Sequence, residues 1–173
     1  MGGSLVARSR EGEGSAFTLT LPCVIDPDTV RSELDPLTPS AGRYHVRHVL
    51  YVEDNETNVE VMRGVLGQRP QVEMAVSITG LDGLAAIRLR RPDLILLDMH
   101  LPDTNGIALL RALRADPHSA TVPVVVVSAD ALTHQIEEAF AAGCSHYLTK
   151  PVSVSELLTV VDELLIEAQS RFG

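Results

Sequence analysis

The chain has 173 residues, of which 45% are hydrophobic, and this is enough for one well-packed domain with some attached segments. Its net charge of −9 at pH 7 provides no basic surface, so we expect no nucleic acid and no anionic lipid as a partner. The apolar runs are all much shorter than the roughly 18 residues that a membrane span needs, so we expect no membrane contact from this chain.

The first 47 residues carry too little regular pattern for a domain of their own. Ser4–Arg8 and Ala16–Leu21 predict two strands joined by a glycine-containing turn, and two strands alone cannot form an independent core. Asp26–His48 contains three prolines and has no lasting hydrophobic period, which is typical of a linker. We therefore predict an N-terminal two-stranded segment over 1–23 and a linker over 24–47.

Over residues 48–170, short β-branched runs alternate with longer segments in which apolar residues recur every three or four positions. This alternation predicts an α/β fold, a five-stranded parallel sheet with helices on both faces. The expected strands are His48–Val52, Val72–Val76, Leu94–Leu97, Val124–Val127 and His146–Thr149. The third and fourth strands are apolar throughout, so we expect both in the centre of the sheet with both faces buried.

Polar side chains directly follow four of these strands. They are Glu53 and Asp54 after the first strand, Asp98 after the third, Ser128 after the fourth and Lys150 after the fifth. Because the carboxyl ends of parallel strands lie at one edge of a sheet, and ligands bind at that edge, we expect the five side chains to meet there.

Three of the five side chains are carboxylates, which repel one another by about 1 kcal/mol per pair in water and about 4 kcal/mol at an effective dielectric of 20. A divalent cation removes this repulsion, and an all-oxygen site with room for water suits Mg²⁺. An aspartate can also act as a nucleophile and form an aspartyl-phosphate, whose oxygens a lysine and a hydroxyl can hold. We predict these roles for Asp98, Lys150 and Ser128.

The same residues stand in motifs that resemble the receiver domains of response regulators and hybrid histidine kinases. The motifs are Glu53–Asp54, Leu97–Gly106 (LDMHLPDTNG), Ser128–Ala129 and Tyr147–Pro151 (YLTKP). The resemblance covers the segment 48–170. It implies the flavodoxin-like receiver fold and a function as a phosphoaccepting domain in a two-component phosphorelay.

The resemblance implies that Asp98 is the phosphoacceptor. It also implies that Glu53, Asp54 and Asp98 bind Mg²⁺ together with the backbone carbonyl of His100. The phosphodonor would be the phosphohistidine domain of a histidine kinase or a histidine phosphotransfer protein.

Three further residues receive roles from the same resemblance. Lys150 would pair with the phosphoryl group, Ser128 would form a hydrogen bond with it, and Tyr147 would change rotamer in response. The family commonly has a cis peptide bond where Lys150-Pro151 stands here.

Residues 1–23 resemble the end of the ATP-binding domain of sensor histidine kinases, in both strands and in the glycine turn. This resemblance implies that the chain is the carboxyl-terminal part of a hybrid histidine kinase, with Met1 either a natural start or an internal residue. No complete catalytic kinase domain is expected, so enzymatic activity is left open. Cys23 and Cys144 have no metal-ligand spacing and indicate reduced thiols, so we expect a cytoplasmic location.

Two other functions are alternatives to the phosphorelay hypothesis. The first is a Mg²⁺-dependent phosphohydrolase with an aspartyl-phosphate intermediate, although such enzymes typically have the nucleophilic Asp on the first strand and another acid two residues later, which this sequence does not have. The second is a module that binds partners without phosphorylation, which the complete set of five polar residues argues against. Taken singly, each residue also has an ordinary structural reading, such as a helix N-terminus for Glu53-Asp54, a strand-end cap for Ser128 or an edge position for Tyr147.

Overall fold

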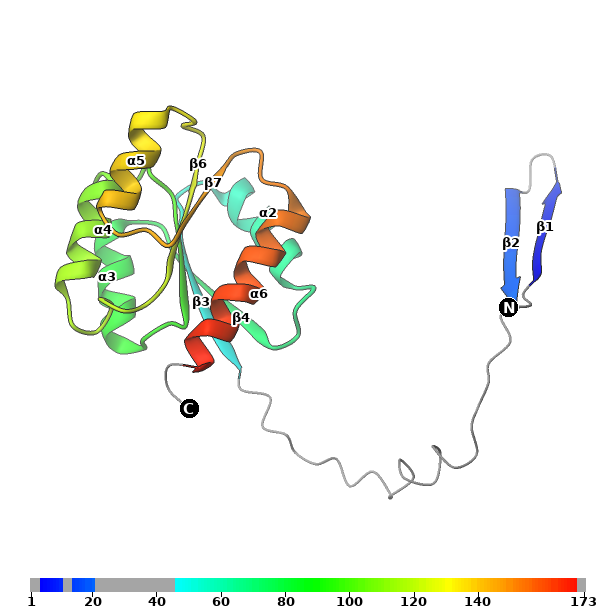
Figure 1. Cartoon of the computed structure of the whole chain (residues 1–173), viewed down its shortest axis with the longest axis horizontal. Helices are drawn as coiled ribbons and strands as arrows, with labels where there is room; N and C mark the ends of the chain where they lie inside the picture. Colours follow the sequence, from blue (N-terminus) through cyan, green and yellow to red (C-terminus); the bar gives the residue numbers. More distant parts are fainter. Residues whose placement is uncertain (1–3, 11–13, 21–45, 171–173) are drawn as a thin grey trace, which may run out of the picture. The chain divides into compact units, whose positions relative to one another are not determined.

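The computed structural model describes residues 4–10, 14–20 and 46–170 of the chain. These belong to two units, within residues 1–43 and 44–173. In the first unit, β1 (Ser4–Arg10) pairs antiparallel with β2 (Gly14–Thr20), as predicted (Figure 1). Most of the predicted linker, 24–47, and the turn between the two strands lie outside the described residues.

The second unit is a five-stranded parallel sheet in the order β4-β3-β5-β6-β7, with helices between the strands. Its elements are β3 (Arg47–Val52), α2 (Glu56–Leu66), β4 (Val72–Ser77), α3 (Gly80–Leu89), β5 (Leu94–Leu97), α4 (Gly106–Ala115), β6 (Val124–Ser128), α5 (Thr133–Ala141), β7 (His146–Thr149) and α6 (Val154–Ser170). The predicted α/β fold is therefore confirmed. Ser128 is the last residue of β6 itself and not the first residue after the strand.

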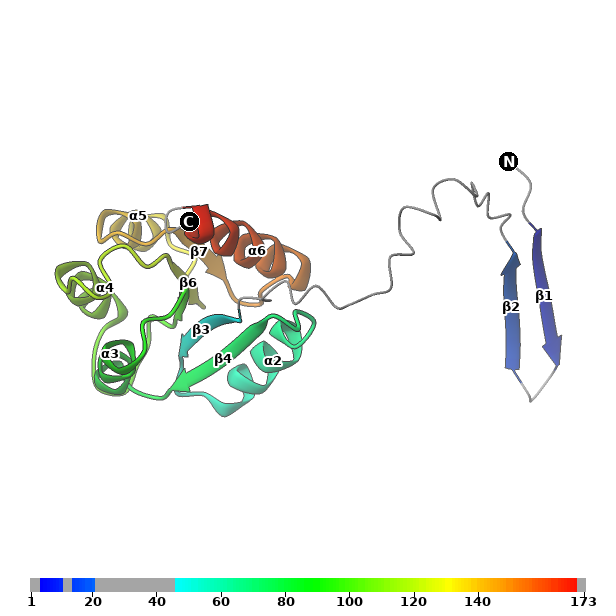
Figure 2. The ribbon, with the colours of Figure 1, turned by 90° about the horizontal axis from the view of Figure 1, so that it is seen from below.

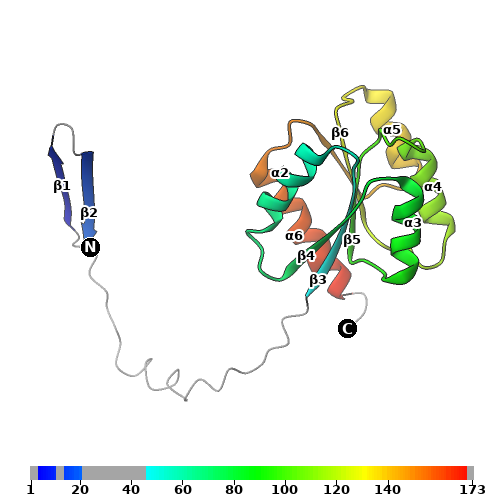
Figure 3. The same cartoon turned by 180° about the vertical axis from the view of Figure 1, so that it is seen from behind.

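Two hydrophobic cores cover the two faces of the sheet, because successive side chains on a strand point to opposite faces. Val49 and Tyr51 pack with α2 and α6, whereas Leu50 and Val52 pack with α3, α4 and α5. Figures 2 and 3 show the same division, with α2 and α6 on one side of the sheet and α3, α4 and α5 on the other. All residues of β5 and β6 are buried, which confirms the predicted central position of these strands.

Asparagine and threonine caps fix the points at which three helices begin beside the strand ends. The side chain of Asn55 accepts hydrogen bonds from two backbone N–H groups of α2, and Asn105 and Thr79 each accept one from α4 and α3. Such caps satisfy N–H groups that the helix itself leaves without acceptors. They also hold the loops that carry the polar residues after β3 and β5. Within the described residues, no helix combines the length and apolar character required to cross a membrane.

Candidate functional site

The five predicted side chains come together at the carboxyl edge of the sheet. Parallel pairing places Val52 beside Leu97, so the residues that follow β3 and β5 are neighbours. The backbone N–H of Asp98 donates to the carbonyl of Val52 at 3.0 Å. On the other side of the sheet centre, the N–H of Lys150 donates to the carbonyl of Ser128 at 2.7 Å. The expectation that these strand ends meet at one edge is therefore correct.

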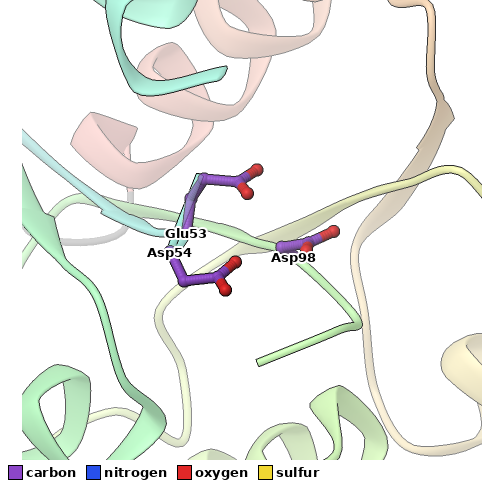
Figure 4. A group of neighbouring side chains, drawn as sticks. All are labelled: Glu53, Asp54 and Asp98. Carbon is purple, nitrogen blue, oxygen red and sulfur yellow. The ribbon is translucent and has the colours of Figure 1, made fainter. Parts of the chain in front are cut away.

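Glu53, Asp54 and Asp98 form a compact carboxylate group, shown in Figure 4. Each offers one oxygen, and these oxygens all lie within 4.8 Å of one another. Glu53 is 1% exposed and Asp98 is 5% exposed, whereas Asp54 is exposed to solvent. The group thus has two carboxylates fixed inside the protein and one that opens to water.

Lys150 lies between the two buried carboxylates. Its Nζ atom is 2.7 Å from Oε2 of Glu53 and 3.1 Å from Oδ1 of Asp98. The peptide bond between Lys150 and Pro151 is cis, as expected from the resemblance. The ammonium group neutralises part of the negative charge that the site concentrates.

Glu53 accepts hydrogen bonds that the sequence motifs did not predict. Its Oε2 atom accepts from the hydroxyl of Tyr51 at 2.7 Å as well as from Lys150, and its Oε1 atom accepts from the backbone N–H of Asn55 at 3.2 Å. Burial alone would raise the pKa of Glu53, but side-chain hydrogen bonds from Lys150, Tyr51 and Asn58, together with the charge of Lys150, outweigh it and hold the pKa below its usual value. Glu53 is therefore an anion at neutral pH.

The pKa of Asp98 is shifted in the opposite direction to that of Glu53. Burial raises the pKa of Asp98 above its usual value, the positive charge of Lys150 opposes this rise, and the negative charge of Glu53 adds to it. A cation bound beside Asp98 would lower this pKa again, because it stabilises the ionised carboxylate. The ionised form of Asp98 is therefore favourable only when a positive charge lies beside it.

Ser128 and Tyr147 are connected through the backbone of Asp130. The hydroxyl oxygen of Ser128, which is fully buried, accepts a hydrogen bond from the N–H of Asp130 at 3.1 Å. The hydroxyl of Tyr147 donates to the carbonyl of Asp130 at 2.8 Å. One residue of the loop after β6 is therefore held from both sides.

His100 contributes its side chain to the same loop. Its Nε2 atom lies 3.4 Å from Oδ2 of Asp130, so the loop after β5 and the loop after β6 touch across the site. The expected role of the His100 backbone carbonyl as a metal ligand stays a prediction.

Two sets of contacts fix the loop between Asp98 and α4, one at Asp103 and one at Gly106. The carboxylate of Asp103 accepts hydrogen bonds from the N–H groups of Gly80 and Leu81, at 2.8 and 2.9 Å, and so anchors the loop on the N-terminus of α3. At Gly106, a Cβ atom would lie 2.7 Å from the Cα atom of Met99, so only glycine allows α4 to begin this close to the loop.

Sequence reasoning missed the contributions of Tyr51, Asp103 and Asp130. A signal existed for Tyr51, since it is a tyrosine within a buried aliphatic strand, and a buried hydroxyl requires a hydrogen-bond partner. The bonds of Asp103 and Asp130 depend on the paths of two loops, which no residue pattern specifies.

The carboxylate group fits a small cation that prefers oxygen ligands. Two oxygens bound to the same Mg²⁺ can be at most about 4.2 Å apart, because each Mg–O distance is about 2.1 Å. The oxygens of Glu53, Asp54 and Asp98 lie within 4.8 Å of one another, so small side-chain rotations would bring them onto one ion. Exposed Asp54 leaves room for the water molecules that Mg²⁺ usually keeps.

Comparison with known proteins agrees with this geometry. The sequence model for the response regulator receiver domain matches residues 49–162, which is more than half of the chain. The chain is also 33% identical over 122 residues to the polar-differentiation response regulator DivK of Brucella anthropi, a match that covers 70% of this chain and 98% of that protein.

Solved structures of receiver domains have the same fold. The receiver domain of a sensor histidine kinase from Pseudomonas aeruginosa, with a magnesium ion coordinated in its active-site cleft, superposes with a TM-score of 0.64 at 28% identity, covering 69% of this chain and 97% of that one. The receiver domain of a histidine kinase from Syntrophus aciditrophicus gives a TM-score of 0.65 at 27% identity, covering 70% and 91%. The chain therefore belongs to the response regulator receiver domain family of two-component signalling.

Proposed function

We propose that residues 48–170 take a phosphoryl group from a phosphohistidine onto the carboxylate of Asp98, and that they then relay this group or switch conformation. The observation that carries the proposal is the position of Asp98, which is 5% exposed and lies beside two further carboxylates and one ammonium group. A buried aspartate beside other carboxylates destabilises the fold unless a positive charge or a bound cation compensates its negative charge.

The cation proposed for the site is Mg²⁺, bound by Glu53, Asp54 and Asp98 and by the backbone carbonyl of His100. When bound, it would neutralise the carboxylates and the incoming phosphoryl oxygens. Support comes from the close grouping of the carboxylate oxygens and from the magnesium-containing site of the Pseudomonas aeruginosa relative.

The proposed transfer uses Asp98, Lys150 and Ser128, which meet at the carboxyl edge of the sheet. An oxygen of Asp98 attacks the phosphorus, the P–N bond to the donor histidine breaks, and the departing imidazole takes up a proton. Lys150, 3.1 Å from Asp98, would move its ammonium group to a phosphoryl oxygen as charge develops there. The hydroxyl proton of Ser128 would be donated to a second oxygen, since its oxygen already accepts from Asp130.

The proposed partner is a phosphohistidine domain, either in a histidine kinase or in a separate phosphotransfer protein. We also propose that residues 1–23 are the end of a kinase ATP-binding domain, joined to the receiver by the linker 24–47, in a hybrid histidine kinase. The two similar receiver domains from Pseudomonas aeruginosa and Syntrophus aciditrophicus are parts of histidine kinases, which supports this arrangement.

The test is intact-mass analysis after incubation with acetyl phosphate. The unmodified chain should gain one phosphoryl group in the presence of Mg²⁺ and none with a chelator, and Asp98→Asn should gain none. Asp93→Asn is the matched control, because Asp93 is a partly buried aspartate at the opposite end of β5, where it accepts from the N–H of His48. Asp93→Asn should be phosphorylated normally. Phosphorylation of Asp98→Asn would show that the acceptor is another residue.

A further inference from the structure

A buried phenol lies behind the acidic site. Tyr51 is in β3, is 1% exposed, and packs in the core between the sheet and helices α2 and α6. Residues two apart on a strand point to the same face, so Tyr51 and Glu53 lie on the same side of the sheet. The Tyr51 hydroxyl donates to Oε2 of Glu53 at 2.7 Å.

The donors that hold Glu53 differ in how fixed they are. Lys150 is partly exposed, shares its ammonium group with Asp98, and must leave Glu53 if it is to follow a phosphoryl oxygen. The N–H of Asn55 makes only a 3.2 Å bond, to the other carboxylate oxygen. The side chain of Asn58 is only partly buried, and its hydrogen bond lowers the pKa of Glu53 less than the bond from Tyr51 does. Tyr51 alone combines a 2.7 Å bond to Oε2 with a ring that is fixed in the core.

Glutamate also needs more fixing than aspartate would. Its extra methylene adds a rotatable bond, so its carboxylate can reach more positions and loses more conformational entropy when it is held in one. A rigid donor at Oε2 removes that freedom before a cation arrives. Partners behind a ligand commonly set its orientation in this way.

We infer that Tyr51 is a positioning residue of this site: its hydroxyl holds Glu53 in place for the divalent cation and keeps Glu53 bonded when Lys150 moves to the phosphoryl group. The inference rests on the proposed function. It assigns Tyr51 no contact with the cation or with the phosphoryl group, since its hydroxyl is directed to Glu53.

The main experiment compares Tyr51→Phe with the unmodified chain in an NMR titration with Mg²⁺, followed at the amide signals of Asn55 and Met99. The variant should bind Mg²⁺ about tenfold more weakly, which is typical for loss of a partner behind a metal ligand. At saturating Mg²⁺, its rate of phosphorylation by acetyl phosphate should fall several-fold, because Glu53 lacks its short bond from the core when Lys150 moves to the phosphoryl group. Thermal unfolding of each variant shows that it is folded at the assay temperature.

Two controls separate positioning from simple loss of a core hydrogen bond. Ser119→Ala removes another buried hydroxyl, which donates to the carbonyl of Leu113 at 2.7 Å and lies before β6, at the opposite edge of the sheet. It should leave Mg²⁺ affinity and phosphorylation rate unchanged. In a Glu53→Gln background, Tyr51→Phe should change the Mg²⁺ affinity far less than it does alone, since its effect acts through Glu53.

A third measurement needs no variant. The hydroxyl proton of Tyr51 should stay protected from exchange with water when Mg²⁺ is added and when beryllofluoride stands in for the phosphoryl group. Loss of this protection in either state overturns the inference, because the bond would then be absent when it is needed.

The outcomes also separate this inference from the proposed function. If the unmodified chain takes up no phosphoryl group with Mg²⁺ present, the proposed function is wrong. If it is phosphorylated and Tyr51→Phe matches it in affinity and rate, only the role of Tyr51 is wrong. Equal weakening of Mg²⁺ binding by Ser119→Ala and Tyr51→Phe would likewise show that Tyr51 only stabilises the core and does not position Glu53.

Discussion

The Nζ atom of Lys150 lies 2.7 Å from Oε2 of Glu53, a carboxylate that is 1% exposed. The same ammonium group is 3.1 Å from Asp98. Lys150 therefore lies where a bound cation would share its carboxylates, and the two positive charges would repel each other. The position that would prepare Lys150 for a phosphoryl oxygen would thus also weaken the proposed site for Mg²⁺.

This competition predicts opposite effects on two measurements in Lys150→Gln. Removal of a nearby positive charge relieves a repulsion of roughly 1 kcal/mol, which corresponds to about fivefold tighter Mg²⁺ binding. Phosphorylation by acetyl phosphate should become slower, because the developing charge on the phosphoryl oxygens loses its cation. NMR titration and intact-mass kinetics measure the two quantities separately.

Lys150→Arg is the matched control, because it keeps the charge and should therefore keep the Mg²⁺ affinity near that of the unmodified chain. Lys150 is also the chain's only lysine, so a sample labelled at lysine reports on this ammonium group alone. Weaker Mg²⁺ binding by Lys150→Gln would contradict the proposed competition and would indicate that Lys150 mainly keeps the carboxylates in place.

The bonds of Asp130 predict the route from Asp98 to the surface. If Ser128 turns to donate to a phosphoryl oxygen, the N–H of Asp130 must follow or lose its acceptor, and the bond from Tyr147 to the Asp130 carbonyl changes with it. A hydrogen bond to a charged group contributes about 1.5 to 3 kcal/mol, enough to shift a two-state equilibrium about ten- to a hundredfold.

We therefore expect Ser128→Ala to accept a phosphoryl group but to transmit little of its effect. Phosphorylation-dependent chemical-shift changes at Tyr147 should shrink strongly in this variant at equal phosphorylation. Ser77→Ala is the control, since Ser77 is a buried serine at the end of the edge strand β4. If Ser128→Ala keeps the full response at Tyr147, the signal travels by another route.

The parallel sheet and the meeting of the five polar residues were predictable because both follow from local patterns. Buried runs such as Leu94–Leu97 mark central strands, and parallel topology then brings the residues after them to one edge. The hydrogen bond between Tyr51 and Glu53 was not predicted, because it depends on side-chain rotamers within a core. The two bonds to Asp130 were not predicted either, because they depend on the path of one loop.

The N-terminal unit gives a prediction about nucleotide binding by this chain. Its described residues form one antiparallel strand pair, β1 with β2, and no further strand of the described chain pairs with it. A nucleotide pocket needs several elements around a concave site, which two strands cannot provide. Calorimetric titration with Mg-ATP should therefore detect no binding, and micromolar affinity would contradict the proposal that 1–23 is only the end of an ATP-binding domain.

The last prediction concerns Asp103, which anchors the loop after Asp98 on α3. Hydrogen bonds from the N–H groups of Gly80 and Leu81 hold the pKa of Asp103 below its ordinary value of 3.8. A carboxylate whose pKa is lower in the folded state stabilises the fold above the unfolded-state pKa, and this stabilisation is lost as the pH falls through the folded-state pKa. Asp103→Asn should therefore melt a few degrees below the unmodified chain at pH 7. The difference should start to shrink below about pH 4, the pKa of an aspartate in the unfolded chain, and should vanish below the lowered pKa of Asp103, where its side chain is as neutral as asparagine. Asp82→Asn is the control, because Asp82 is an exposed acid in the first turn of the same helix. It should change the melting temperature less at pH 7. A difference between Asp103→Asn and the unmodified chain that stays constant from pH 7 to pH 3 would show that the charge of Asp103 does not stabilise this loop.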